Sequence, residues 1–170
     1  VDPNSALRRS SVLSEVTTML AQFDTTAREI QALRDEAHMR ARSVMEEANA
    51  LMSGIAQLNT AIQRAKIGGL SASEAETEQQ RMMDRLAEII DIRVQNRPLG
   101  GVEIRTQDGL LLVDLDSARL AMSTSDTAGA YPGAVMIPPR SNAETPLDSH
   151  ISGGELKGLL RARDKELVNL

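Results

Sequence analysis

The chain has 170 residues, of which 41% are hydrophobic and 25% charged, a composition that suits a folded protein of one ordinary domain or two small ones. Its net charge of −5 provides no basic surface for nucleic acid. The absence of cysteine excludes disulfides, thiol catalysis and cysteine-ligated metal, and no apolar run is long enough to cross a membrane. We therefore expect neither nucleic acid nor a membrane among its partners.

A repeat of apolar residues from about Val12 to Lys66 is the strongest pattern, and it predicts a long helix over residues 6–66. Apolar residues recur in alternating steps of four and three, the 3.5-residue repeat of a coiled coil, and only Arg34 interrupts them. We read Arg34 as a surface residue whose guanidinium reaches water. On this helix, the predicted helix-packing seam comprises Val16, Leu20, Phe23, Ala27, Ile30, Ala41, Val44, Leu51, Ile55, Leu58 and Ile62.

The composition of the seam bears on how the helix is stabilised. Several of its positions are alanine, so each buries little apolar area. A helix of this kind needs partner helices along its length, as in an assembly of rods. The alternative is a long hairpin within one domain.

A second helix is predicted over residues 74–90, after the glycine pair that ends the first. Two overlapping capping boxes, Ser71 with Glu74 and Ser73 with Glu76, predict where it starts. The short link predicts that this helix folds back antiparallel on the end of the first one.

The apolar period changes to two after the second helix, which predicts strands. One strand covers Ile90 to Val94, and the Asp108-Gly109 pair predicts a hairpin between residues 103–107 and 110–115. Further strands are expected at residues 119–123 and 134–137, and prolines make the stretch 123–148 irregular.

A last helix is predicted from Glu155, after a Ser-Gly-Gly turn. Its apolar stripe comprises Leu156, Leu160, Leu167 and Leu170, and the first three complete the predicted seam. Arg163 interrupts the stripe. The sequence ends at Leu170, on the apolar stripe, without a glycine, asparagine or proline that would end a helix. We therefore expect the natural protein to continue.

Together these elements predict an α+β fold in three parts. Residues 1–90 form a long α-helical hairpin or coiled-coil rod, residues 91–150 a small inserted antiparallel β subdomain, and residues 151–170 a returning C-terminal helix of the rod. His38 and His150 lie far apart without a ligand cluster, so we predict no catalytic residue, no cofactor site and no metal site.

Three stretches of this chain resemble the flagellar hook-associated protein 1 family. The first is a long helix that opens with residues 7–16 and closes with an I-x-x-L-N-x-x-I run from Ile55 to Ile62. The second is the helix-to-strand passage from Asp84 to Val94, followed by the Asp108-Gly109 hairpin. The third is the G-G-x-L-x-x-L-x-x-x-R-D start of the returning helix, which is the most specific of the three.

The resemblance implies a structural subunit of the bacterial flagellum, not an enzyme, that connects the hook to the filament. It implies a ring of identical subunits in the full-length protein, with the hook protein and hook-associated protein 3 as neighbours. It also implies secretion by the flagellar type III route and an export chaperone that binds a C-terminal part outside this chain. The chain alone is expected to be a monomer because the family's terminal polymerisation segments are absent from it.

Two alternative functions remain open from the sequence. Within the flagellar resemblance, the first alternative is hook-associated protein 3 or a flagellin-like axial protein. A general coiled-coil interaction module of a secretion or signalling apparatus would share the long seam, but not the β insertion or the returning helix.

Overall fold

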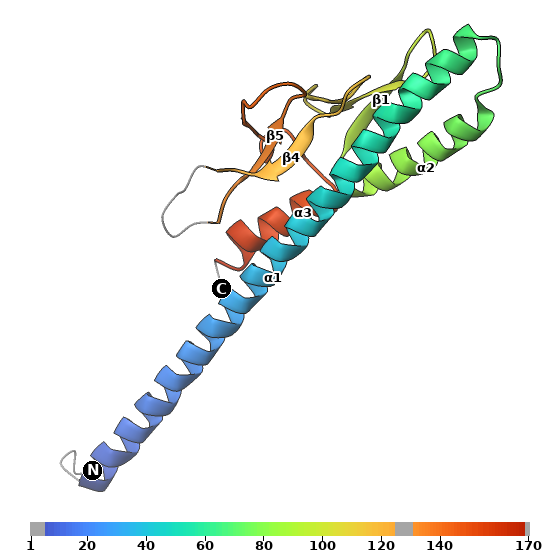
Figure 1. The fold of residues 1–170 in the computed structure, drawn as a ribbon. Coiled ribbons are helices and arrows are strands. Elements are labelled where there is room, and N and C mark those ends of the chain that lie inside the picture. The colour runs from blue at the N-terminus through green and yellow to red at the C-terminus, as the bar shows by residue number, and fades with distance from the viewer. Residues whose placement is uncertain (1–5, 125–130, 169–170) are drawn as a thin grey trace.

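The computed structural model describes residues 6–124 and 131–168. Its longest element is a single helix of 62 residues, against which every other element is arranged (Figure 1). The helices are α1 (Ala6–Ile67), α2 (Ser73–Ile89) and α3 (Glu155–Arg161), which continues as a π-helical turn, η1 (Ala162–Glu166). The α+β fold with a long helix, a shorter helix, small antiparallel sheets and a returning C-terminal helix is therefore confirmed.

Among the described residues between α2 and α3, six strands form two separate antiparallel sheets. One sheet has the order β1-β2-β3 and the other β4-β5-β6. The strands are β1 (Ile92–Asn96), β2 (Val102–Thr106), β3 (Leu111–Val113), β4 (Arg119–Met122), β5 (Ala134–Ile137) and β6 (Thr145–Pro146). The predicted hairpin at Asp108-Gly109 joins β2 to β3, and Gly109 takes a φ of +90° there.

Some boundaries differ from the sequence prediction. Strand β1 begins at Ile92 instead of Ile90, because Ile90 is the C-cap of α2 and its amide donates the last helical hydrogen bond to Leu86 O, at 2.9 Å, and not a bond to a neighbouring strand. The short strand β6 lies in the proline-rich stretch that was expected to be irregular. It contains only two residues, so Pro146 removes few ladder hydrogen bonds.

The predicted capping boxes of α2 are wrong. The N-cap residue is Ala72, which offers no side-chain oxygen and makes no side-chain capping hydrogen bond. Ser73 is already the first helical residue, and the Ser71 hydroxyl lies 3.1 Å from the Ser73 hydroxyl. An ion pair at 2.7 Å between Lys66 and Glu76 ties this end of α2 to the end of α1.

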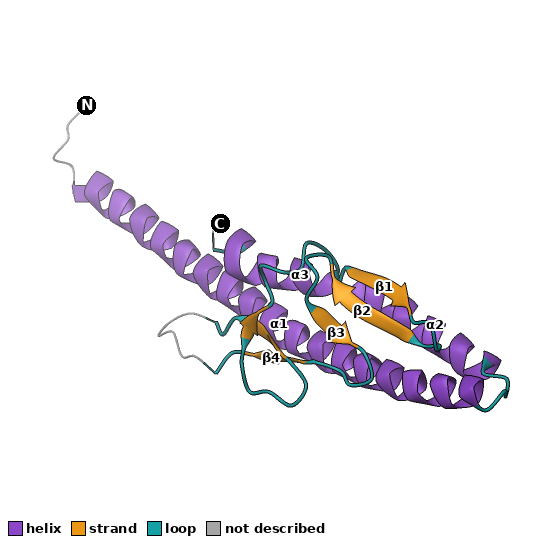
Figure 2. Cartoon of the chain, turned by 90° about the horizontal axis from the view of Figure 1, so that it is seen from above, coloured by secondary structure: helices purple, strands orange, loops and turns teal. Residues whose placement is uncertain are grey.

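The two halves of α1 have opposite environments. Side chains at Ala41, Ala48, Ile55 and Ile62 on its C-terminal half are fully buried. Figure 2 shows why: α2, α3 and both sheets lie along that half of the helix. Every side chain from residue 8 to residue 29 is exposed, and this part of α1 projects alone from the rest of the chain (Figure 1). We call residues 8–29 the arm.

The hydrophobic core is built from aliphatic and methionine side chains. It joins Met52 and Ile55 of α1 with Leu86 of α2, Leu112 of β3 and Leu156 of α3. One cluster thus spans the helices and the sheets. Flexible methionines fit the irregular spaces between such different elements.

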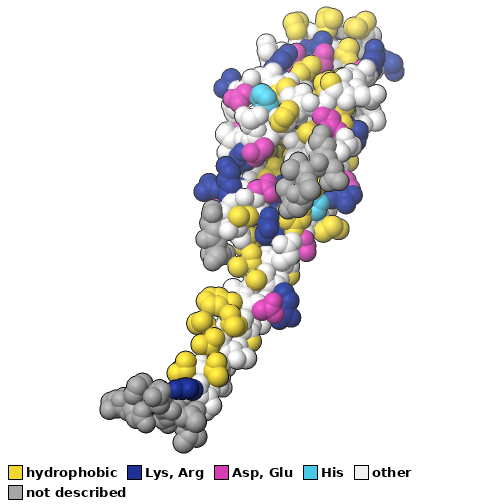
Figure 3. Space-filling model, turned by 90° about the vertical axis from the view of Figure 1, so that its left-hand side faces the viewer, with side chains coloured by type: hydrophobic (Ala, Val, Ile, Leu, Met, Phe, Trp, Pro, Cys, Tyr) yellow, Lys and Arg dark blue, Asp and Glu magenta, His cyan; other side chains and the backbone are white. Residues whose placement is uncertain are grey.

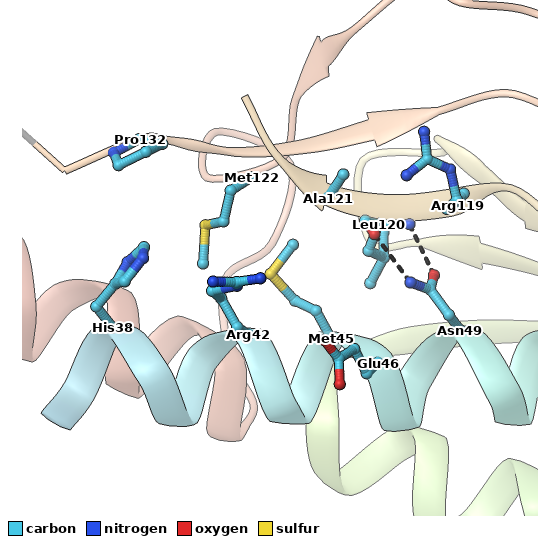
Figure 4. Close-up of a pocket in the computed structure, with 10 residues that line it drawn as sticks. All are labelled: His38, Arg42, Met45, Glu46, Asn49, Arg119, Leu120, Ala121, Met122 and Pro132. Atoms are coloured by element: carbon cyan, nitrogen blue, oxygen red, sulfur yellow. Dashed lines mark hydrogen bonds between the residues drawn. The ribbon is translucent and has the colours of Figure 1, made fainter. Parts of the chain in front are cut away.

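Two asparagines of α1 attach the sheets to the helix through hydrogen bonds. The Asn49 amide donates to Leu120 O at 2.9 Å and accepts from Leu120 N at 2.7 Å (Figure 4). Asn59, which is fully buried, does the same with Val102 at 2.7 Å for both bonds. Each asparagine amide bonds the backbone N–H and C=O of one strand residue, as the backbone of a neighbouring strand would. One sheet is thus attached to α1 at Asn49 and the other at Asn59.

Candidate helix-packing surface

The arm presents a wide apolar stripe to solvent. Phe23 is 64% exposed and Val16 42% exposed, on a helix face that no other described element covers. Residues spaced by three, four and seven share one face of a helix. The exposed members of the stripe are Val12, Leu13, Val16, Met19, Leu20 and Phe23. Figure 3 shows hydrophobic side chains running along the projecting part of the molecule.

The structure divides the predicted seam into three groups. Exposed on the arm are Val16, Leu20, Phe23 and Ala27. Half-buried are Ile30, Leu51, Leu58 and Leu167, and buried are Ala41, Val44, Ile55, Ile62, Leu156 and Leu160. Leu170, the last member of the predicted leucine stripe, lies outside the described residues. The chain's own α2, α3 and sheets thus cover the seam from about Ala41 onwards, and the arm keeps the same repeat without a cover.

A groove lies at the base of the arm, where the bare and covered parts of α1 meet. It has a volume of about 490 Å³ between α1 and the returning segment. Leu33 and Ala37 form one wall, and Leu159, Ala162 and Leu167 form the other. The apolar surface of the arm therefore continues into a depression that is formed by two helices.

Charged side chains hold α2 and α3 against α1 beside this surface. The Arg85 guanidinium donates to both carboxylate oxygens of Glu47, at 2.7 and 2.9 Å, and lies 3.7 Å from Glu155. Glu155 in turn accepts from Arg40 at 3.1 Å. The hydrogen bonds from Arg85 lower the pKa of Glu47. These groups are partly exposed, so the network orients the helices more than it stabilises them.

A polar cluster lies between α1, η1 and the start of the segment that leads into β5. Its members, which we call the Tyr131 cluster, are Gln31, Arg34, Asp35, His38, Tyr131 and Arg163. The Tyr131 hydroxyl donates to Asp35 and accepts from Gln31. Burial and the hydrogen bond to Asp35 raise the pKa of Tyr131. The guanidiniums of Arg34 and Arg163 lie 5.0 and 5.2 Å from its ring centre.

Sequence reasoning missed this cluster. The sequence pattern shows Arg34 and Arg163 as interruptions of two apolar stripes and predicts a surface position for Arg34. The structure contradicts this interpretation: Arg34 is half-buried and donates to Arg163 O at 3.0 Å, and Arg163 is only 1% exposed. The available signal was that both arginines interrupt apolar stripes assigned to one predicted seam, where a surface arginine is out of place.

Within residues 6–124 and 131–168 no group of three acidic or histidine side chains is arranged to hold a metal ion. In the same residues no helix is long and apolar enough to cross a membrane. His38 belongs to the Tyr131 cluster, and His150 lies 3.9 Å from Asp108 in the β2–β3 turn. A cavity of about 390 Å³ between α1 and β4 has His38 at one end and Asn49 at the other (Figure 4).

A long helix with a bare apolar arm, fixed at its other half to a compact α+β base, is the architecture of a rod-shaped structural protein. The sequence model of the flagellar hook-associated protein FlgK helical domain matches residues 1–170. The chain therefore belongs to this family.

The fold is also similar to a solved structure, that of the flagellar hook junction protein FlgK from Burkholderia pseudomallei. The TM-score is 0.81 at 22% sequence identity, and the match covers 94% of this chain and 29% of that one. At this identity the likeness concerns the fold. The chain spans less than a third of the length of that relative. Comparison with curated protein sequences gave no match.

Proposed function

We propose that this chain is the helical part of a structural adaptor at the junction between the hook and the filament of a bacterial flagellum. The family match and the fold support this role over that of a general coiled-coil module. The single observation that carries it is the exposed apolar stripe on the arm, from Val12 to Phe23, in a helix whose other half is buried by its own chain. Exposed apolar faces of this extent mark sites of association.

The proposed mechanism is mechanical. The hook bends while the filament stays stiff, so an adaptor must offer a firm packing surface. Helices packed side by side resist bending because bending would disturb many close contacts at once. In this proposal the arm packs against helical segments of the full-length protein and of neighbouring copies, and the sheets, which lie away from the arm, face outward.

The proposed partners follow the family. They are other copies of the protein in a ring, the hook protein and hook-associated protein 3. An export chaperone would bind a C-terminal part outside this chain, and the protein would leave the cell by the flagellar type III route. We propose a structural and not a catalytic role, because the surface that distinguishes this chain is apolar and suited to contact, not to chemistry.

Electron microscopy of a strain that lacks the gene tests the proposal. The expected result is hooks without attached filaments and release of filament monomers into the medium. Normal filaments on the deletion strain would refute it.

Complementation then tests the arm. The full-length gene with Val16→Lys and Phe23→Lys should fail to restore filaments, because lysines on the stripe cannot be buried against a partner helix. The matched control is Thr18→Lys with Thr25→Lys, which adds the same charge to the opposite face of the same helix. Filaments and motility restored equally well by both variants would exclude the stripe as the contact surface.

A further inference from the structure

His38 makes a contact that depends on its protonation state. Its Nδ1 atom lies 2.9 Å from Nη1 of Arg163, which belongs to η1. A guanidinium carries only donors and keeps its charge at any pH that a protein survives. Nδ1 of His38 must therefore accept this hydrogen bond, so the ring is neutral and carries its proton on Nε2.

The Arg163 guanidinium has few other ways to satisfy its charge. It is 1% exposed, and its Nε and Nη2 atoms both donate to Asp164 at 2.7 Å. His38 supplies the acceptor for the remaining nitrogen. A buried guanidinium without that acceptor is unfavourable, because it has neither water nor a protein partner on one side.

Charged groups face His38 from each element packed around it. On α1 these are Asp35 and Arg42, and on η1 they are Arg163 and Asp164. The centre of the Tyr131 ring lies 5.1 Å from the centre of the His38 ring, and the Arg34 guanidinium lies 5.0 Å from the same tyrosine ring. Burial first, and then Arg163 and Arg42, lower the pKa of His38 below 6.5, and the two aspartates oppose this only in part.

We propose that His38 is a proton-controlled latch: the neutral ring holds Arg163, and with it η1, against α1, and the protonated ring releases them. Protonation places a hydrogen on Nδ1 that points at an N–H of Arg163 and sets two cations side by side. Both effects favour separation of η1 from α1.

Release of η1 would alter the helix-packing surface. Ala162 and Leu167 form part of one wall of the groove at the base of the arm, and Arg34 on the opposite helix donates to the backbone of Arg163. When η1 separates from α1, that wall moves and the Arg34 hydrogen bond is lost. The latch thus goes beyond the proposed junction role, since it makes the shape of this surface depend on pH whatever partner occupies it.

Tyrosine fluorescence of the 170-residue chain tests the latch directly. The chain has one tyrosine and no tryptophan, so Tyr131 is the only strong fluorophore and it lies in contact with His38. We expect a single fluorescence transition with a midpoint below pH 6.5. We expect amide hydrogen exchange in residues 162–167, corrected for its intrinsic pH dependence, to accelerate with the same midpoint. Between the pKa of His38 in the latched state and its pKa in the released state, each pH unit changes the ratio of released to latched molecules about tenfold.

His38→Gln keeps an acceptor for Arg163 but does not titrate, so it should abolish both transitions. His150→Gln is the matched control and should leave both unchanged, because His150 lies beside Asp108 of the β2–β3 turn and is not part of the Tyr131 cluster. A transition that persists in His38→Gln would overturn the proposal, since Asp35 or Asp164 would then be its source. In the wild-type chain, NMR titration of the His38 ring without accelerated exchange in residues 162–167 would overturn it as well, whether or not the variant folds.

Discussion

The side chain of Asn59 pairs with the backbone of Val102 as a neighbouring strand would. Its Nδ2 atom donates to Val102 O and its Oδ1 atom accepts from Val102 N, both at 2.7 Å. The same amide donates to Asp114 O at 2.6 Å and accepts from Gln79 at 2.9 Å. One buried residue thus joins α1 to α2, to β2 and to the segment after β3.

Replacing Asn59 should therefore be costly. Asn59→Leu keeps the approximate volume but leaves polar groups of Val102, Asp114 and Gln79 without a partner. We expect a loss of about 3 kcal/mol in the free energy of unfolding, measured by urea denaturation. Gln57→Leu on the exposed side of the same helix is the control and should change stability by less than about 0.5 kcal/mol. Similar values for the two variants would contradict the central role of Asn59.

Gly101 gives a second prediction, because it lies against this asparagine. It has a φ of +78°, and an added Cβ would lie 2.5 Å from Asn59 Oδ1. Gly109 has a φ of +90° with nothing within 4 Å of an added Cβ. Gly109→Ala should cost about 1 kcal/mol from backbone strain alone. Gly101→Ala should cost roughly 1–3 kcal/mol more because of the clash.

Denaturation midpoints of the two alanine variants separate these contributions. Both variants carry a similar cost for a positive φ. The difference between their midpoints therefore measures the cost of the clash between the β1–β2 turn and Asn59 of α1. If Gly109→Ala is the more damaging change, the turn does not pack on Asn59 in solution.

Much of the helical layout was accessible from the sequence. The repeat that runs through Ile55 and Ile62 predicted α1, and Asp108-Gly109 predicted the β2–β3 hairpin, because both patterns are local. The same repeat could not tell the buried half of α1 from the exposed arm, since Val16 and Val44 look alike until the rest of the chain is placed. Asn59 and Arg163 were missed for a related reason: a buried polar residue is recognised only by its distant partners.

The pair of Glu47 and Arg85 predicts a specific pH dependence. Hydrogen bonding to Arg85 lowers the pKa of Glu47 below its ordinary value of 4.5. The unfolded chain therefore binds this proton more tightly than the folded chain does. Stabilisation by the pair is complete above about pH 4.5 and is lost as the pH falls through the lowered pKa of the folded state.

Glu47→Gln should remove that contribution. We expect a small loss of stability at pH 7, because the pair is largely exposed, and a flatter decline of stability between neutral pH and pH 3. Glu29→Gln on the arm removes the same charge away from Arg85 and should keep the wild-type profile. Thermal denaturation across this pH range makes the comparison. Parallel curves for Glu47→Gln and the wild-type chain would contradict the assignment.

The arm gives the last prediction. Its side chains are all exposed, so it adds no core contact, and a helical segment of this length is only marginally stable in water. Removing residues 1–26 should leave the urea midpoint of the chain unchanged, and in the intact chain amide exchange should be fast in residues 8–29 and slow around Ile55 and Ile62. Sedimentation should report a monomer for the 170-residue chain. A concentration-independent oligomer that dissociates on removal of residues 1–26 would mean instead that the stripe pairs with its own copy, without segments from outside this chain.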